Sequence, residues 1–593
     1  MTAGPEADAI ALFQAGRFAE AEVAFVAILE KNPRHANALH ALGVIALQSQ
    51  RLEEAVALLQ RANKAQPGSF TILYNLGSAL RRSNRHADAL PAFRRAVSLN
   101  ARSAEAHLGL GNTLREMGDI GRARECFATA LRIDSTLAAA KYNLALVEIE
   151  GGNDPAAESW LRQVVEREPA NAEAWNHLGL IAHRRQALDE AIGHYSRALE
   201  ARPSFAPALA NHGNALKDRG DLPGALGFYE RAITADPAET GAWINLAAVR
   251  LEQGRLEAAR AAATRALEVR PLLADAQYAL GLVQLREHDF ANGWDGYERR
   301  FETVPPVASV RAPHRPRLSA TDLAKAKRVA VRMEQGLGDQ ILYSSLLPEL
   351  QAQGLECVVE VDPRLVAAYR RSFPRCEFPE AQAAASAIAT CDHEIPLGSL
   401  PALFRRSVEA FDAQPSATLT ADRGRAAHAQ RVLGEGRSIG ISWRSFQGFG
   451  RMHVANRKSI PLECFGALAA SGARLVDLQY GDVAAERRAF DERHPGLRCE
   501  VPVDLRDDIE GVLGAIEACD LVVTSSNVTA HFAGALGKRT WLVYLGANPP
   551  FHYWAPRADG SCLWYPSVEI ITDPRWTRWE DALHAVAGRL ASG

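Results

Sequence analysis

The spacing of apolar positions divides the chain into two parts. Up to about residue 301, apolar positions recur with helical spacing in a block that repeats along the chain. From Arg328 onward, short apolar runs alternate with helical patterns, as in Val329–Met333 followed by Ile341–Leu350. The pattern predicts an all-helical first part and a second part that combines helices with parallel strands.

Small residues and prolines in the first part recur with a period of 34 residues. One such position is glycine in six repeats and alanine in two others, Ala145 and Ala247. A glycine inside a helix costs about 1 kcal/mol relative to alanine, so its regular recurrence indicates that two helices approach closely there. Prolines near the repeat ends stop the second helix of each repeat. The glycines of this register are Gly43, Gly77, Gly111, Gly179, Gly213 and Gly281.

The period and the shared registers resemble the tetratricopeptide repeat (TPR). The resemblance implies about nine repeats over residues 2–303, coiled into a solenoid whose concave face is lined by the first helix of each repeat. Asparagines recur on that face, similar to the asparagine ladder of the TPR-bearing O-GlcNAc transferases. An asparagine side chain can donate to and accept from one peptide unit, so the face is expected to bind an extended polypeptide. The alternative is a row of solvated polar side chains. The ladder residues are Asn75, Asn143, Asn211 and Asn245.

In the second part, an apolar strand ends in Gly336-Leu337-Gly338-Asp339, and a helical pattern follows. Two successive strand–helix alternations, residues 328–425 and 437–593, predict two Rossmann-like lobes that face a cleft. The proline-containing residues 304–327 are predicted to be a linker.

Four stretches of the second part resemble the heptosyltransferase-like glycosyltransferases, which have the GT-B fold, in the branch that is fused to TPR repeats. The stretches are Gly336–Asp339, Ile439–Arg444, Asp520–Lys538 and Trp564–Ser567. The resemblance implies an inverting, metal-independent glycosyltransferase. Its acceptor side would lie in residues 328–425 and its nucleotide-sugar side in residues 437–593.

Sugar transfer to a hydroxyl needs a base for the acceptor proton and positive charge for the departing phosphate. The family's catalytic aspartate matches Asp339, and the alternative is an ordinary helix cap. Gly336 and Gly338 let a ligand approach the backbone closely. Arg444 and Lys458 match basic residues that hold the donor phosphates, and the alternative for each is a solvated surface cation.

The stretch from Ser525 to His531 follows a buried strand and opens a helix, so its N–H groups are expected to face the donor. Ser526 and Asn527 stand where the heptosyltransferase pattern has Asp and Thr, which leaves the donor sugar open. His531 either contacts the donor or is a core histidine. The other residues expected on the donor side are Ser442, Gln479 and Thr529. The acidic stretch Asp504–Asp508 is interpreted as charge at a helix N-terminus, and no metal site is expected.

Composition restricts the setting. A net charge of −3 gives no global reason to expect nucleic acid or an anionic membrane as partner. No apolar run reaches membrane-spanning length, and the N-terminus lacks the pattern of a secretory signal. The eight cysteines form no Cys-x-x-Cys pair, which fits free thiols in a reducing compartment. A cytoplasmic location is therefore expected.

These observations and the resemblance lead to one functional hypothesis with two alternatives. The first is transfer of a sugar to Ser or Thr of a protein held by the repeats. By resemblance to bacterial flagellin glycosyltransferases, the acceptor would be flagellin and the donor a CMP-nonulosonic acid. The second is an enzyme of lipopolysaccharide or other surface-glycan synthesis whose repeats recruit partner enzymes. The third is a scaffold with a vestigial transferase domain.

Overall fold

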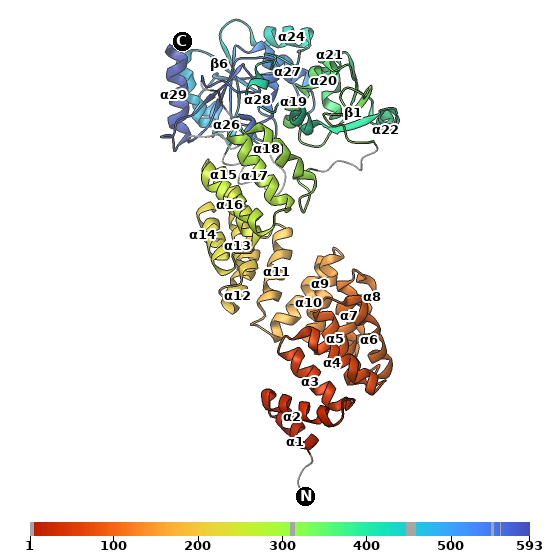
Figure 1. Ribbon diagram of the computed structural model, residues 1–593. Coiled ribbons are helices and arrows are strands. Elements are labelled where there is room, and N and C mark those ends of the chain that lie inside the picture. Colours follow the sequence, from red (N-terminus) through yellow and green to blue (C-terminus); the bar gives the residue numbers. More distant parts are fainter. Residues whose placement is uncertain are drawn as a thin grey trace. The chain divides into compact units, whose positions relative to one another are not determined.

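The computed structural model describes residues 5–308, 315–445, 458–546, 551–554, 556–557 and 559–592 (Figure 1). From Pro5 to Tyr297 the chain forms helices in consecutive pairs, as the repeat pattern predicts. The pairs are α1 (Pro5–Gln14) and α2 (Phe18–Lys31), α3 (Ala36–Gln48) and α4 (Leu52–Ala65), α5 (Phe70–Arg82) and α6 (His86–Leu99), α7 (Ala104–Glu116) and α8 (Ile120–Ile133), α9 (Ala138–Glu150) and α10 (Asp154–Arg167), α11 (Ala172–Arg184) and α12 (Leu188–Ala201), α13 (Ala206–Arg219) and α14 (Leu222–Ala235), α15 (Thr240–Glu252) and α16 (Leu256–Val269), and α17 (Ala274–Arg286) and α18 (Phe290–Tyr297).

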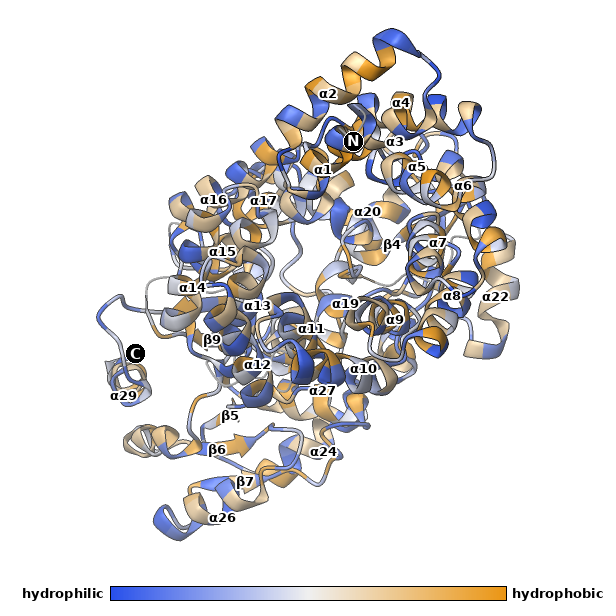
Figure 2. Cartoon of the chain, turned by 90° about the horizontal axis from the view of Figure 1, so that it is seen from below, coloured by the Kyte–Doolittle hydropathy of each residue, from blue (hydrophilic) through white to orange (hydrophobic). Residues whose placement is uncertain are grey.

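Five of the six repeat glycines lie where the first helix crosses a large side chain of the second helix, and the sixth, Gly281, faces the backbone of Gly296. A Cβ on Gly179 would lie 2.4 Å from the Tyr195 ring, and one on Gly111 would lie 2.6 Å from the Phe127 ring. Where Ala247 takes the glycine's place, it packs in a cluster with Ala263, a smaller partner sixteen positions further along. The close approach that the glycine register predicted is thus confirmed. Figure 2 shows that the repeat helices carry hydrophobic and hydrophilic residues along their length.

A second register appears only in the structure. In every helix pair, one residue in the turn between the two helices has a left-handed backbone conformation, with φ between 57° and 95°. Glycine supplies this conformation without a Cβ clash, whereas Gln, Asn and His adopt it at some cost. The residues are Gly16, Gln50, Asn84, Gly118, Gly152, Gln186, Gly220, Gly254 and His288.

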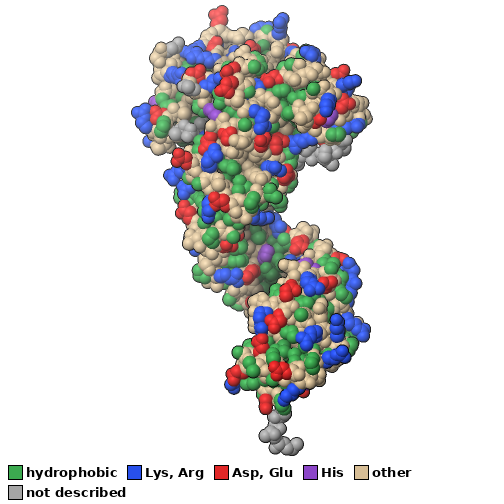
Figure 3. Space-filling model, viewed as in Figure 1, with side chains coloured by type: hydrophobic (Ala, Val, Ile, Leu, Met, Phe, Trp, Pro, Cys, Tyr) green, Lys and Arg blue, Asp and Glu red, His purple; other side chains and the backbone are tan. Residues whose placement is uncertain are grey.

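The chain divides into two compact units, Met1–Asn211 and His212–Gly593. The division falls inside α13, not at the end of the repeats near residue 303. The second unit therefore holds the last repeats together with the α/β part. Acidic and basic side chains are interspersed on the face shown in Figure 3.

The α/β part contains two sheets whose strand pairs are all parallel. The first sheet has the order β3-β2-β1-β4 and the second has the order β10-β9-β8-β5-β6-β7. In each sheet, the strands that follow the first strand lie on one side of it, and the later strands lie on its other side. This is the doubly wound pattern. The strands are β1 (Arg328–Arg332), β2 (Glu356–Val359), β3 (Cys376–Glu377), β4 (His393–Pro396), β5 (Ser438–Ser442), β6 (Arg474–Asp477), β7 (Arg498–Glu500), β8 (Leu521–Thr524), β9 (Thr540–Val543) and β10 (Val568–Ile571).

Helices connect these strands. They are α19 (Leu337–Ser344), α20 (Leu347–Ala352), α21 (Val366–Ser372), α22 (Ala381–Ala389), α23 (Leu400–Phe404), α24 (Arg423–Leu433), α26 (Ala484–Arg493), α27 (Ile509–Ala518), α28 (Val528–Ala535) and α29 (Trp579–Ser592). The 3-10 segments are Glu298–Phe301, Pro363–Leu365, Leu397–Ser399, Glu409–Phe411, Leu462–Ser471 and His552–Trp554. The helical pattern Ile341–Leu350 is divided between two helices, α19 and α20, because Pro348 in the first turn of α20 lacks the N–H that a continuous helix would use.

The segment predicted to be a linker, residues 304–327, is partly ordered against the first sheet. Its residues 309–314 lie outside the described ranges. Further on, the buried Leu318 donates its N–H to the Glu394 carbonyl at 2.8 Å, and Arg317 pairs with Glu394 in a parallel bridge. One buried apolar cluster joins Trp294 of the last repeat with Val329 of the first sheet and Val522 of the second. Among the described residues, no helix is long and apolar enough to cross a membrane.

Candidate functional site

A cavity of about 330 Å³ lies between the carboxyl ends of the two sheets. In doubly wound sheets this edge, next to the strand where the order reverses, is where ligands bind. The cavity brings together residues that are far apart in the sequence. The predicted site residues that line it are Gly336, Gly338, Asp339, Lys458, Ser526, Asn527 and His531.

Asp339 reaches this cavity from the first turn of α19. The N-cap residue of α19 is Gly336, which has no side chain to cap the helix. Asp339 is therefore not the N-cap residue that the alternative interpretation required. Burial, followed by the negative charge of Asp339, raises the pKa of the Tyr553 phenol, which also lines the cavity. A carboxylate therefore faces a cavity bordered by the second sheet.

Gly338 lines the cavity and also makes room for a neighbouring side chain. A Cβ at this position would lie 2.9 Å from Cδ2 of His531, so the glycine makes room for the histidine ring. A Cβ on Gly336, in contrast, would meet only Oδ2 of Asp339 at 3.6 Å, an ordinary contact. The Gly-x-Gly turn thus brings α19 against α28.

His531 lines the cavity and is also a core residue. Its Nδ1 lies 3.1 Å from the Tyr565 hydroxyl, and its ring centroid lies 4.8 Å from that of Trp554. Burial, assisted by the positive charge of Lys458, lowers the pKa of His531 to about 3. The imidazole is therefore neutral at physiological pH, and the ring combines the packing of a core histidine with a place in the cavity wall.

The start of α28 offers backbone rather than side-chain groups to the cavity. Asn527 caps the helix, with Oδ1 accepting from Ala530 N at 3.3 Å, and its Nδ2 donates to Ser442 Oγ at 2.9 Å. Ser526 Oγ accepts from the Trp554 indole at 2.9 Å. The cap uses the N–H of Ala530, which leaves the N–H groups of Val528 and Thr529 in the first turn to meet an anion.

Two predicted donor residues lie behind this turn and do not line the cavity. Ser442, fully buried at the end of β5, accepts from Thr529 Oγ1 at 3.2 Å. Thr524 Oγ1 donates to the Ser442 carbonyl at 2.7 Å. These contacts fasten the ends of β5 and β8 together and so position the helix start.

Among the described residues, three with cationic side chains line the cavity: Arg364, Lys458 and Arg506. Nζ of Lys458 lies 3.6 Å from the centre of the Phe551 ring, which places the ammonium against an aromatic face. Arg506 is exposed, and its guanidinium forms no hydrogen bond or ion pair with a described residue. Arg364 donates to Asp362 at 2.9 Å and to the Arg506 carbonyl at 3.1 Å.

Arg506 and Arg364 were missed by the sequence analysis. Arg506 lies within the acidic stretch 504–508, where Asp508 caps α27 by accepting from Gly511 N at 3.0 Å. The interpretation of this stretch as helix N-terminal charge is therefore confirmed for Asp508. The sequence could have indicated Arg506 only through its position, because it follows the third strand of a doubly wound sheet, at the edge where ligands bind.

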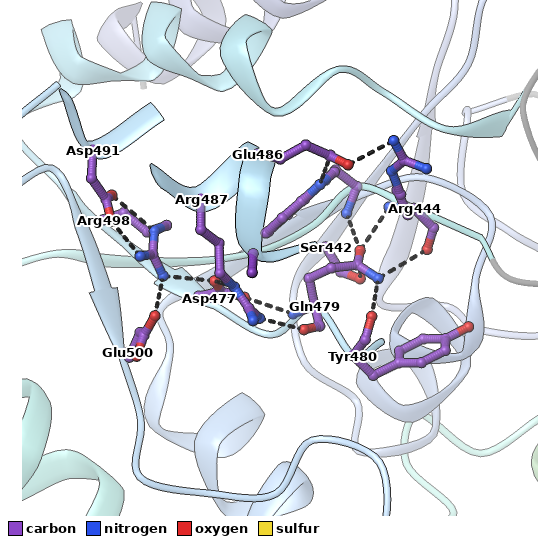
Figure 4. A network of polar contacts seen from close by, with 12 residues as sticks. Ser442, Arg444, Asp477, Gln479, Tyr480, Glu486, Arg487, Asp491, Arg498 and Glu500 are labelled. Carbon is purple, nitrogen blue, oxygen red and sulfur yellow. Dashed lines mark hydrogen bonds and ion pairs between the residues drawn. The ribbon is translucent and has the colours of Figure 1, made fainter. Parts of the chain in front are cut away.

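Arg444, the other basic residue predicted to hold the donor phosphates, does not line the cavity. Its guanidinium pairs with the Glu486 carboxylate (Figure 4), at a distance of 2.6 Å, and its side chain is 43% exposed. It borders a separate surface depression with Pro461 and Arg493. The backbone of Arg444 follows β5 as expected, but the side chain turns toward α26.

Gln479 is a structural clamp (Figure 4). Its fully buried amide oxygen accepts from the backbone N–H groups of Trp443 at 2.7 Å and Arg444 at 2.6 Å. Its amide nitrogen donates to the Tyr480 carbonyl at 2.8 Å. Next to it, the buried Asp477 binds Arg487 and Arg498, each at 2.8 Å. Gln479 therefore holds the ends of β5 and β6 together.

The asparagine ladder makes contacts within the array. Asn75 Nδ2 lies 2.8 Å from His40 Nε2, and Asn211 Nδ2 donates to Asn176 Oδ1 at 3.0 Å, each reaching the preceding repeat. Asn143 donates to the Ala139 carbonyl of its own helix at 2.8 Å. These three residues belong to the first unit, and Asn245 lies half-buried on α15 of the second.

Comparison with protein families identifies the first part. One family model, described as tetratricopeptide repeat, matches residues 12–77 and 216–284. A second, with the same description, matches residues 74–138, 109–171 and 142–206. The chain therefore contains a tetratricopeptide-repeat array, as its period of 34 predicted.

A curated relative is Protein FlbA of Caulobacter vibrioides, 30% identical over 340 residues. The match covers 54% of this chain and 55% of that protein, so the chain spans about half the length of this relative.

Three of the solved structures that match parts of the chain each have a TM-score below 0.5. The Cut9–Hcn1 tetramer subunit is 18% identical, covering 47% of this chain and 55% of its own, with a TM-score of 0.37. YrrB, described as a TPR protein with an unusual peptide-binding site, is 24% identical over 31% of this chain and 95% of its own, with a TM-score of 0.27. The Pseudomonas aeruginosa pilF product is 17% identical over 35% and 94%, with a TM-score of 0.32.

Proposed function

We propose that the chain is a glycosyltransferase of the GT-B type that moves a sugar from a nucleotide-activated donor to a protein hydroxyl. The observation that carries the proposal is the cavity in which Asp339, from the first sheet, faces Lys458, Arg506 and the start of α28 from the second. A carboxylate on one side and cations on the other are what transfer from a phosphate leaving group requires.

The proposed reaction is a single displacement. The Asp339 carboxylate takes the proton of the acceptor hydroxyl while the hydroxyl oxygen attacks the anomeric carbon. The bond from that carbon to the phosphate oxygen breaks, and the electron pair leaves with the phosphate. Lys458, Arg506 and the first-turn N–H groups of α28 offset the negative charge that develops there. Attack from the side opposite the leaving group inverts the anomeric configuration.

The repeat array is proposed to bind the protein acceptor. TPR arrays present a long concave surface to their partners, and the chain devotes half its length to one. Flagellin as acceptor and a CMP-nonulosonic acid as donor follow from the resemblance of the sequence to bacterial flagellin glycosyltransferases. A cytoplasmic location is part of this proposal.

A second candidate is a TPR scaffold whose α/β part no longer transfers sugar. Asn527 favours it, because this side chain is engaged in capping α28 and fastening Ser442. In such a protein the cavity would have no nucleotide to bind.

Thermal denaturation of the full chain with a panel of nucleotides and nucleotide sugars tests the proposal. A ligand at a hundred times its dissociation constant adds about 2.7 kcal/mol of stability, which gives a clear rise in Tm. We expect a rise with one class of nucleotide. Intact-mass analysis of flagellin incubated with the chain and the nucleotide sugar so identified should then show an added glycosyl mass. No shift with any nucleotide would favour the scaffold.

A further inference from the structure

The loop that precedes the candidate base is held by two residues at the end of the last repeat, Tyr297 and Arg300. Glu334 and Gln335 directly precede Gly336 in this loop. The Arg300 guanidinium donates to the two carboxylate oxygens of Glu334 at 3.0 and 2.8 Å. The Gln335 amide donates to the Tyr297 hydroxyl at 2.7 Å.

The ion pair is built to fix geometry. The side chain of Arg300 is 0% exposed and that of Glu334 is 1% exposed. Glu334 also accepts from Gly398 N at 2.6 Å, and Arg300 donates to Ser399 Oγ at 2.8 Å. A buried pair of this kind contributes little net stability, but its two-pronged hydrogen bonding specifies one arrangement of the chain.

Tyr297 contacts residues on both sides of Asp339 in the sequence. Its hydroxyl lies 3.5 Å from that of Tyr343, which is four residues after Asp339 on α19. Residues four apart share one face of a helix, so Tyr297 contacts the loop before Asp339 and the helix turn after it. Its ring also packs against Tyr278, from the first helix of the same repeat, with centroids 5.9 Å apart.

We propose that Tyr297 and Arg300 are positioning residues for Asp339, so that the last repeat of the array is part of the frame of the active site. The inference rests on the proposed function for the role of Asp339, but the contacts exist whatever the reaction is. A displacement of about 1 Å in a reacting group can cost a hundredfold in rate, so loosening this frame should slow transfer while the donor still binds.

The test uses the full chain and two variants, Tyr297→Phe and Arg300→Lys. The control is Arg299→Lys, at the neighbouring half-buried arginine, which pairs with Glu302 at 3.1 Å and does not contact the loop in any described hydrogen bond or ion pair. Amide hydrogen exchange of residues 333–341 reports on the loop independently of activity. We expect exchange at least about threefold faster in both variants and unchanged in the control. We also expect kcat to fall about 10- to 100-fold with the nucleotide Kd within about twofold.

Each result has a defined meaning. Loop exchange equal to that of the control in both variants overturns the inference, as does an unchanged kcat in an active enzyme. If the unaltered chain neither binds nucleotide nor transfers sugar, the proposed function fails, and the exchange measurement still decides whether the last repeat orders the loop. Tyr297→Phe keeps the ring and its packing, so it remains informative if Arg300→Lys does not fold.

Discussion

The indole N–H of Trp294 donates to the main-chain carbonyl of Arg405 at 2.7 Å, and both residues are buried. One belongs to the last repeat helix, α18, and the other follows α23 in the α/β part. Trp294 also meets Trp564 edge to face, with centroids 6.4 Å apart. The last repeat is therefore a structural component of the α/β part.

Truncation should reveal this dependence. A fragment of residues 304–593, cut where the repeats end in sequence, exposes the aromatic surface that receives Trp294 and leaves Glu334 without its buried partner. We expect it to aggregate or to remain unfolded. A fragment of residues 206–593, which keeps α13 to α18, should be monodisperse and melt cooperatively. Size-exclusion chromatography and circular dichroism compare the two, and a well-folded 304–593 fragment would contradict the expectation.

The sequence predicted those features that a local pattern determines. The glycine register is visible because each repeat must make the same close contact, such as that of Gly179 with Tyr195. Asp339 could be placed in the cleft because the turn after a first parallel strand opens at the carboxyl edge of the sheet.

Other features depend on side-chain direction, which no local pattern gives. Arg444 follows its strand as expected, yet Glu486, 42 positions further along, draws its guanidinium away from the cavity. The position of Gln479 suggests a ligand residue, but backbone groups of Trp443, Arg444 and Tyr480 use its amide. The left-handed register of the repeats escaped notice because Gln50, Asn84, Gln186 and His288 interrupt its glycines.

Replacement of the candidate base separates chemistry from binding. Asp339→Asn keeps the size of the side chain and removes its ability to take a proton. We expect kcat for sugar transfer to fall by about 10²- to 10⁴-fold, the usual contribution of a general base, with the nucleotide Kd nearly unchanged. Asp339→Glu, which restores a carboxylate, should recover part of the rate. Equal rates for Asp339→Asn and the unaltered chain would remove Asp339 from this role.

The two arginines of the second sheet should respond differently to truncation. Arg506→Ala removes a cation from the cavity, and a charge-assisted hydrogen bond to phosphate corresponds to about a tenfold or greater loss of nucleotide affinity. Arg444→Ala removes an exposed ion pair with Glu486 and should change the affinity less than about twofold. Isothermal titration with the nucleotide found in the panel measures both. The reverse ranking would show that Arg444, as the sequence suggested, meets the donor.

Two glycines of one repeat provide a matched test of the packing. A Cβ on Gly179 would collide with Tyr195, so Gly179→Ala should destabilise the first unit by about 1–3 kcal/mol, as overpacking does. Gly193, on the second helix of the same repeat, has no atom within 4 Å of its added Cβ. Gly193→Ala should stabilise by about 0.5–1 kcal/mol through helix propensity. Urea denaturation followed by circular dichroism measures both, and equal effects would show that helix propensity alone governs these positions.

Two buried histidines should make the second unit sensitive to acid. Burial lowers the pKa of His531 to about 3, with a smaller contribution from Lys458, and burial with a smaller contribution from Arg286 lowers the pKa of His552 to about 3. In the unfolded chain a histidine titrates near 6.5, so between about pH 6.5 and 3 the unfolded state binds protons that the folded state excludes. Folding stability is therefore full above pH 6.5 and falls as the pH decreases, by up to about 1.4 kcal/mol per pH unit for each imidazole.

His552→Phe isolates one of these contributions. Phenylalanine suits the aromatic surroundings of His552, where Trp294 lies 5.5 Å away between centroids, and it cannot take up a proton. We expect the Tm of the variant, relative to the unaltered chain, to rise steadily between pH 7.5 and pH 5. His428→Phe, at an exposed position of α24, should leave the pH dependence as it is. Parallel Tm curves for His552→Phe and the unaltered chain would contradict the expectation. They would mean that His552 takes up a proton in the folded protein as readily as in the unfolded chain, despite its burial against Trp294 and Tyr343.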